Sequence, residues 1–246
     1  MESIRQSSAP YLYDPNELES LPPPVQRYFR VALRPGQPII QSVWLDQEGW
    51  FNGSETREAW HPFTATQRVL PRQSAFDWNA RIRIFPGLDI RVHDAYFRNE
   101  GYLHAAVCGA LTVAKSSGSP EATQGEFMRF AAEAPWYPTS MLPSQGAVWS
   151  EVNEKSATLK LRDQTIQTTL LMHFGSDHLI QSFEAAARQR GTTGKSKEAP
   201  WQGRFWDYVS RSGMMVPRQG EVEWVLADGP RPYWRGRVTS FRYEFS

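Results

Sequence analysis

One carboxylate in the sequence has a position that could support acid–base chemistry. Asp94 follows the apolar positions of 88–92, and a period of two places its side chain on their face of a strand, together with Tyr96. A carboxylate that faces an apolar interior has a raised pKa and can act as an acid or a base. Two alternatives stay open: a β-bulge turns Asp94 outward, or it pairs with Arg81 or Arg83 on a neighbouring strand.

Three further residues could contribute to the same chemistry. Glu133 and Tyr137 lie in a proline-rich segment, and Arg81 lies in a regular strand. A carboxyl or phenol can donate or accept a proton, and an arginine can hold an anion. Asp94, Glu133, Tyr137 and Arg81 are therefore the candidate catalytic residues, without an assigned reaction.

The motifs of several large enzyme classes are missing from the sequence. There is no Gly-x-Ser-x-Gly elbow, His-Glu-x-x-His helix, phosphate loop, Gly-x-Gly-x-x-Gly or EF-hand loop. The five histidines and the single Cys108 do not have the spacing of a zinc site, and His173 and His178 offer only a weak chelate across a turn. We predict no metal site and no cofactor.

Tryptophan is frequent, with ten residues in the chain. Large flat side chains on one face of a curved sheet can line a trough for an apolar ligand, or they can form a packed core and cross-strand pairs. The stiff segment 133–143, EAPWYPTSMLP, could cap the open side of such a trough. The candidate ligand-binding residues are Trp78, Tyr96, Trp136, Tyr137, Met141 and Leu142.

These residues are carried by short strands and few helices. Apolar and polar residues alternate without a fault over 76–84, which is typical of a strand with one buried face. Pro22 to Leu33 have helical spacing, and Ser119 followed by Pro120 predicts the start of a helix that ends before Pro135. We predict roughly ten strands and two or three helices. The expected strands are 39–51, 76–84, 88–92, 102–113, 147–153, 157–162, 165–174, 179–188, 203–209, 216–226 and 236–245.

The order of these elements predicts a mainly β (α+β) fold. Short connections favour antiparallel pairing, and a sheet of this length should curl. We expect an unclosed half-barrel whose concave side is packed with two or three short helices. Residues 1–20 are predicted to be a polar N-terminal arm and 21–246 a single half-barrel domain, with a flexible loop at 191–199.

Composition excludes some partners. A formal net charge of +1 argues against nucleic acid, which needs a clustered basic surface. Mean hydropathy is -0.54, no run of apolar residues is long enough to predict a membrane-spanning segment, and the N-terminus lacks a secretory signal. The sequence therefore predicts a cytoplasmic protein.

Several stretches carry a family resemblance over nearly the whole chain after residue 20. They resemble an uncharacterised bacterial family of unknown function, which implies no catalytic residue. Many members of that family begin with membrane-spanning segments, and this chain departs from that pattern. The stretches are LPPPVQRYFRVAL (21–33), FDWNARIRI (76–84), FMRFAAEAPWYPTSMLPSQGAVW (127–149), PWQGRFWDYVSRSGMMVPRQGEVEW (200–224) and PYWRGRVTSFRYEF (232–245).

A looser resemblance is carried by Phe205-x-Asp207-Tyr208 and the following Val216-Pro217. These residues resemble the LolA/LolB lipoprotein-carrier superfamily. That resemblance implies an unclosed antiparallel barrel in which helices plug an apolar cavity. The same architecture serves carriers and an enzyme of violacein synthesis, so the resemblance favours an apolar ligand without choosing between binding and catalysis.

Three hypotheses of function follow. The first is a protein that binds a hydrophobic, lipid-like or aromatic small molecule in the concave trough, which predicts an apolar cavity without convergent ionisable groups. The second is an enzyme that uses the trough for proton transfer or cyclisation, which predicts a buried, pKa-shifted group at the cavity wall. The third is a module that binds a protein partner through an exposed aromatic patch or an open sheet edge.

Overall fold

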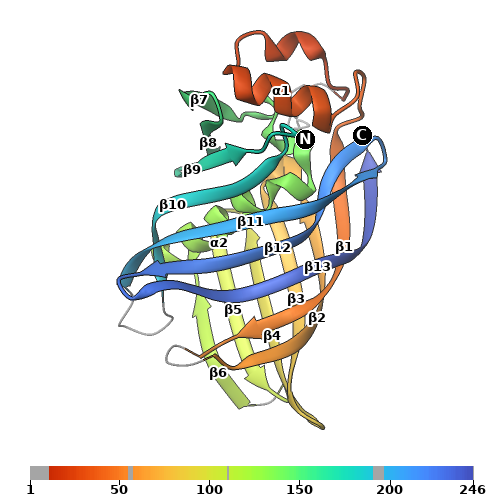
Figure 1. Ribbon diagram of the computed structural model, residues 1–246. Coiled ribbons are helices and arrows are strands. Elements are labelled where there is room, and N and C mark those ends of the chain that lie inside the picture. The colour runs from red at the N-terminus through yellow and green to blue at the C-terminus, as the bar shows by residue number, and fades with distance from the viewer. Residues whose placement is uncertain (1–10, 55–57, 110, 191–196, 246) are drawn as a thin grey trace, which may run out of the picture.

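One antiparallel sheet forms the body of the protein. The computed structural model describes residues 11–54, 58–109, 111–190 and 197–245 (Figure 1). The strands of the first arm of the sheet are β1 (Ile40–Asn52), β2 (Trp60–Leu70), β3 (Ala75–Phe85), β4 (Leu88–Phe97), β5 (Glu100–Val107) and β6 (Leu111–Ser117). Those of the second arm are β7 (Val148–Asn153), β8 (Ser156–Asp163), β9 (Ile166–Phe174), β10 (Ile180–Arg190), β11 (Lys197–Arg211), β12 (Met214–Leu226) and β13 (Gly229–Phe245).

The sheet is unclosed, as predicted. Its order is β6-β5-β4-β3-β2-β1-β13-β12-β11-β10-β9-β8-β7, so β6 and β7 are the two edges in the described part of the chain. Neighbouring strands within each arm also follow one another along the chain. The two arms join where β1 pairs with β13, from Ile40 opposite Phe245 to Phe51 opposite Trp234.

The structure describes thirteen strands, more than the sequence predicted. The predicted strand 102–113 is a hairpin, because Cys108 and Gly109 both have positive φ and turn the chain between β5 and β6. Strand β2 was not predicted, although its burial alternates. In the predicted loop 191–199, residues 197–199 belong to β11, and 191–196 lie outside the described residues.

A helix runs through the concave side of the sheet. Helix α2 (Pro120–Ala132) packs against β4, β5 and β6 on one side and against β9 and β10 on the other (Figure 1). Its predicted start is confirmed: the Ser119 hydroxyl accepts a hydrogen bond from the Ala122 amide at 3.1 Å, and Pro120 occupies the first turn. Because the sheet curls around it, α2 has no solvent-facing stripe over most of its length, and even Glu126 is buried.

The second helix lies at one end of the sheet rather than in the trough (Figure 1). Helix α1 (Pro23–Ala32) packs on β8 and β12, and the ring of its Tyr28 lies 5.8 Å from that of Phe174. Within the described residues, the remaining helical elements are short 3-10 turns: η1 (Pro15–Leu18), η2 (Pro71–Gln73), η3 (Ala134–Trp136), η4 (Pro138–Met141) and η5 (Pro143–Gln145).

The predicted N-terminal arm is partly integrated into the fold. Residues 1–10 lie outside the described residues. Of the remainder, Tyr13 and Leu18 are buried in the hydrophobic core. Neither α-helix in the described ranges combines the length and the hydrophobicity needed to span a bilayer.

Candidate functional site

A cavity of about 1310 Å³ lies between α2 and the two arms of the sheet. Its lining residues come from β3, β4, β5 and β6 of the first arm, from α2, and from β10, β11, β12 and β13 of the second arm. A space of this size exceeds the usual range for small-molecule pockets, about 300–1,000 Å³. The curled sheet therefore encloses a site rather than only a packed core.

One wall of the cavity is apolar. Ile84, Ile90, Val92 and Leu103 point inward from β3, β4 and β5, and each is only half-buried. The register of the strands sets this wall, since Val92 pairs with Ala105 and all inward positions fall on alternate residues. Apolar side chains left uncovered inside a fold favour an apolar occupant.

The opposite wall is aromatic. Trp201 of β11, Trp224 of β12 and Tyr233 of β13 line it. The rings of Trp224 and Tyr233 stack with centroids 5.9 Å apart, and the Trp201 indole N–H donates to the Tyr233 hydroxyl at 3.0 Å. These contacts fix the rings, so the wall has a defined shape.

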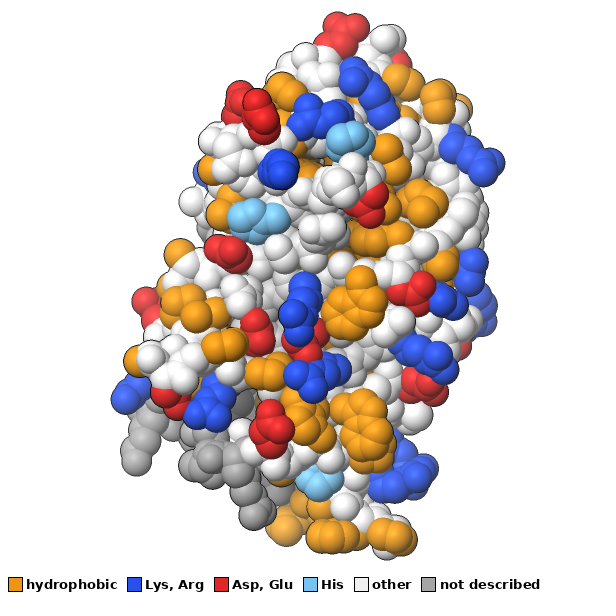
Figure 2. Space-filling view, viewed as in Figure 1, with side chains coloured by type: hydrophobic (Ala, Val, Ile, Leu, Met, Phe, Trp, Pro, Cys, Tyr) orange, Lys and Arg blue, Asp and Glu red, His pale blue; other side chains and the backbone are white. Residues whose placement is uncertain are grey.

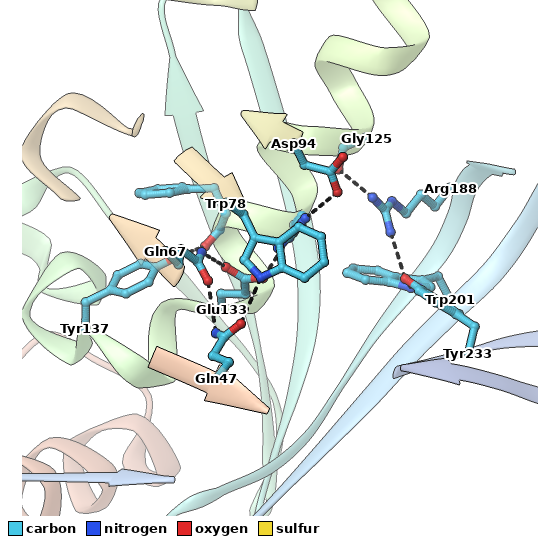
Figure 3. A network of polar contacts seen from close by, with 12 residues as sticks. Gln47, Gln67, Trp78, Asp94, Gly125, Glu133, Tyr137, Arg188, Trp201 and Tyr233 are labelled. Atoms are coloured by element: carbon cyan, nitrogen blue, oxygen red, sulfur yellow. Dashed lines mark hydrogen bonds and ion pairs between the residues drawn. The ribbon is translucent and has the colours of Figure 1, made fainter. Parts of the chain in front are cut away.

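An arginine projects from β10 beside this aromatic wall (Figure 3). The Arg188 guanidinium lies 4.3 Å from the Trp201 ring centroid. It donates to the Tyr233 hydroxyl at 3.3 Å and to the Gly125 carbonyl of α2 at 3.1 Å. Its Nε–H is buried and has no hydrogen-bond partner.

A second arginine lies on α2 and is fully ion-paired. The Arg129 guanidinium donates to Asp94 and to Glu133, each at 2.8 Å. It also lies over the rings of Phe76 and Trp78, 4.9 Å and 4.7 Å from their centroids. Although burial opposes its charge, the carboxylates of Glu133 and Asp94 hold the pKa of Arg129 above its ordinary value. This arginine pairs with both carboxylates and braces α2 against the first arm.

Glutamines extend this ion pair into the sheet (Figure 3). The Gln67 amide donates to the Glu133 carboxylate at 2.5 Å and accepts from the Gln47 amide at 3.1 Å. The Gln47 carbonyl in turn accepts from the Trp78 indole N–H at 2.8 Å. Each of these hydrogen bonds satisfies a polar group inside the fold. Together they fix the position of the end of α2 relative to β1, β2 and β3.

Two carboxyl oxygens at the cavity have no partner. They are Oε2 of Glu126 and Oδ1 of Asp94. Glu126 is 7% exposed and Asp94 is 8% exposed. Burial, and then repulsion by Asp94, raise the pKa of Glu126 to about 7; burial also raises the pKa of Asp94, against the lowering effect of Arg129. Because Asp94 has the direct ion pair with Arg129, the negative charge is better placed on Asp94 and the proton on Glu126.

Four of the predicted site residues line the cavity, namely Trp78, Asp94, Glu133 and Trp136. Asp94 lies on the predicted inner face, so no bulge turns it outward. Its predicted partners were wrong: it pairs with Arg129 of the helix, while Arg81 lies on the outer face and pairs with Asp89.

The other four predicted ligand-binding residues, Tyr96, Tyr137, Met141 and Leu142, lie in the packed core and not at the cavity. The segment 133–143 folds into successive 3-10 turns whose polar groups are used internally. The Tyr137 hydroxyl donates to the Phe130 carbonyl at 2.6 Å, and the Met141 carbonyl accepts from the Trp149 indole at 2.9 Å. Within this segment, only Glu133 and Trp136 of the predicted site residues line the cavity, so the segment as a whole does not cap an open trough.

Three charged residues of the site were not predicted: Glu126, Arg129 and Arg188. A signal was present, since 126, 129 and 133 have the spacing of one helical face. In a helix at the surface of a fold, such a charged face lies in water, so the spacing alone does not predict a site. Here both faces are covered, because α2 lies inside the sheet.

In the described ranges, no three or more side chains of His, Cys, Asp and Glu are grouped so that they could hold an ion. The single cysteine, Cys108, is exposed in the β5–β6 turn, away from the cavity.

Comparison with known proteins identifies the family. The chain belongs to a family of unknown function, DUF6920, whose model matches residues 19–243. No curated protein matches it. The predicted membership of an unknown-function family is confirmed.

Two solved structures match this chain at low sequence identity. A LolA superfamily protein from Nitrosomonas europaea is 9% identical, with 91% of this chain and 93% of that chain covered and a TM-score of 0.42. A β-barrel-like protein of the DUF1849 domain from Brucella abortus is 9% identical, with 87% and 100% covered and a TM-score of 0.20. At these values the likeness identifies neither a ligand nor a reaction.

Proposed function

We propose that this protein binds a hydrophobic small molecule, lipid-like or aromatic, in the cavity between the two arms of the sheet. The observation that carries the proposal is the apolar wall of half-buried Ile84, Ile90, Val92 and Leu103, which faces the aromatic wall across about 1310 Å³. An aqueous cavity would leave these side chains in water, and an apolar occupant would bury them. Cytoplasmic localisation stays a prediction.

The test is native mass spectrometry of the protein purified from its own host, followed by denaturing extraction. We expect a stoichiometric apolar molecule that is released on unfolding. Ile90→Glu should abolish binding of this molecule, because an apolar ligand would have to remove water from the new charge on the apolar wall. Arg91→Glu is the matched control, since Arg91 is the next residue of β4 and is exposed on the opposite face. An empty wild-type protein that also ignores lipids and aromatic metabolites would contradict the proposal.

A second function, proton transfer to or from the bound molecule, is favoured by Glu126. Its carboxyl lines the cavity, has an unpaired oxygen and has a pKa raised by burial to about 7, near the value that suits a general acid or base. The convergent ionisable groups also differ from the purely apolar lining expected of a simple carrier. Incubation of the extracted molecule in D₂O tests this function. Deuterium incorporation should require the protein and be lost in Glu126→Gln; equal incorporation in both would exclude it.

Binding of a protein partner has less support. The outer face carries exposed Trp44, Trp50 and Trp206. Figure 2 shows hydrophobic side chains interspersed with charged ones on the viewed face rather than gathered in one continuous patch. Two arginines, Arg68 and Arg242, also lie over the Trp44 ring, 4.8 Å and 5.7 Å from its centroid. A protein partner stays a prediction.

A further inference from the structure

Arg188 differs from the other buried guanidinium at the cavity. Arg129 has two carboxylate partners, whereas Arg188 makes no ion pair with any described residue. Its two hydrogen-bond partners, the Tyr233 hydroxyl and the Gly125 carbonyl, are both neutral. A guanidinium has five N–H donors, and these contacts use two of them. Arg188 therefore has unused N–H donors at the wall of the cavity, and no carboxylate is in direct contact with its charge.

The orientation of Arg188 is fixed before any ligand arrives. Trp201 lies under the guanidinium at 4.3 Å, Trp224 lies at 5.8 Å, and Tyr233 and Gly125 hold two of its nitrogens (Figure 3). One alternative is that Arg188 has only a structural role, because its hydrogen bond to Gly125 connects β10 to α2. Bracing alone leaves the buried Nε–H without an acceptor, which costs free energy in a folded protein.

The carboxyl groups of the cluster are less suited to hold a ligand head group. Asp94 and Glu133 are already bound to Arg129. Glu126 is buried beside Asp94, and a protonated Glu126 could itself donate to an anion. With Glu126 protonated, the charges of Asp94 and Glu133 balance those of Arg129 and Arg188. A carboxylate head then adds one negative charge to the site, whereas a dianionic phosphate adds two and meets more repulsion from Asp94 and Glu133.

Resting on the proposed function, we infer that the ligand is amphipathic: a carboxylate head accepts hydrogen bonds from Arg188, and an apolar tail lies along Ile84, Ile90, Val92 and Leu103. A planar carboxylate matches the fork of a guanidinium. The head would lie at the α2 and β10 side of the cavity and the tail on the β3 to β5 side, both of which line the same space. The unsatisfied donor and the uncovered apolar wall are then explained by one molecule.

The test uses three probes with the same twelve-carbon tail and different heads: laurate, dodecanol and dodecylamine. Each displaces the neutral fluorophore N-phenyl-1-naphthylamine from the full-length protein near neutral pH. We expect laurate to bind about tenfold to a hundredfold more tightly than dodecanol, as one charge-assisted contact provides. Arg188→Met should remove that preference, so that laurate binds no more tightly than dodecanol. Arg188→Lys, which keeps the charge, should restore part of it.

Arg242→Met is the matched control, since Arg242 is exposed and does not line the cavity. Thermal unfolding of each variant checks that it folds. Equal binding of laurate and dodecanol by the wild type would overturn the assignment of Arg188 and leave the proposed function intact. Tightest binding of dodecylamine would also overturn it, in favour of the Asp94 and Glu126 oxygens. Failure of the fluorophore and of all three probes to bind would overturn both the inference and the proposed function.

Discussion

Glu126 makes the folding free energy depend on pH. The folded state holds its proton more tightly than the unfolded chain, because burial and Asp94 raise the pKa from 4.5 to about 7. The stabilising effect of that proton is therefore complete below about pH 4.5 and is lost as the pH rises through about 7. An ionised, buried carboxyl without a partner is the destabilised state at high pH.

Replacement of Glu126 by glutamine should remove this dependence. Between about pH 4 and pH 8, the free energy of unfolding of the wild type should fall by up to about 3 kcal/mol relative to Glu126→Gln. Urea denaturation at several pH values measures the difference. Glu121→Gln makes the same chemical change at an exposed position of α2 and should run parallel to the wild type. If the free energy of unfolding had the same pH dependence in the wild type and in Glu126→Gln, the pKa of Glu126 would not be raised in the folded protein.

Single residues of the site were predictable where the period of a strand was decisive. Asp94 and Trp78 fall on the inner face because the alternation in β3 and β4 is unbroken. Depth within the core was not predictable in the same way. Tyr137 and Met141 have the composition expected of a ligand cap, but composition does not say whether a ring meets a ligand or a neighbouring 3-10 turn.

At the scale of elements, the close contact between β5 and α2 determines the position of the helix. A Cβ atom at Gly101 would lie 2.6 Å from the Ala122 carbonyl oxygen and 2.7 Å from the Thr123 Cα. The Gly101 amide also donates to the Thr123 hydroxyl at 3.1 Å. Helix and strand are thus close enough that only glycine fits between them.

Gly101→Ala should force α2 away from β5. We expect a loss of about 1–3 kcal/mol in the free energy of unfolding, the usual cost of overpacking, measured by urea denaturation. Gly53→Ala is the control, because the nearest atom to its added methyl would be the Phe51 ring at 3.6 Å. Equal stability of the two variants would contradict this account, because it would mean that α2 can move away from β5 without loss of stability.

The helix was predictable as an element and its surroundings were not. Ser119 and Pro120 marked its start from local chemistry alone. That α2 is enclosed on both sides depends on how far the sheet curls, which short-range periodicity does not determine. The sequence therefore does not distinguish the charged face at 126, 129 and 133 from a solvated one, although these residues line the cavity.

At the scale of the whole molecule, the residues that line the cavity of about 1310 Å³ lack van der Waals contacts that a bound ligand would supply. A ligand that binds only the folded state stabilises it by mass action. Laurate at about one hundred times its dissociation constant should raise the free energy of unfolding by about 2.7 kcal/mol. For a chain of this size that is a rise of roughly 5–10 °C in Tm by calorimetry. An unchanged Tm at saturation would contradict binding to the folded state.

The pairing of β1 with β13 has a consequence for the order in which the protein acquires its structure. Every other neighbouring pair of strands is also adjacent along the chain, so each arm can assemble from local hairpins. Ile40 and Phe245, by contrast, must meet across almost the entire chain, and closing so long a loop is slow. Since both arms line the cavity, we expect the cavity to be complete only after these two strands have paired. A half-folded intermediate would have sheets and hairpins but no place for a ligand, so ligand capture reports completion of the fold.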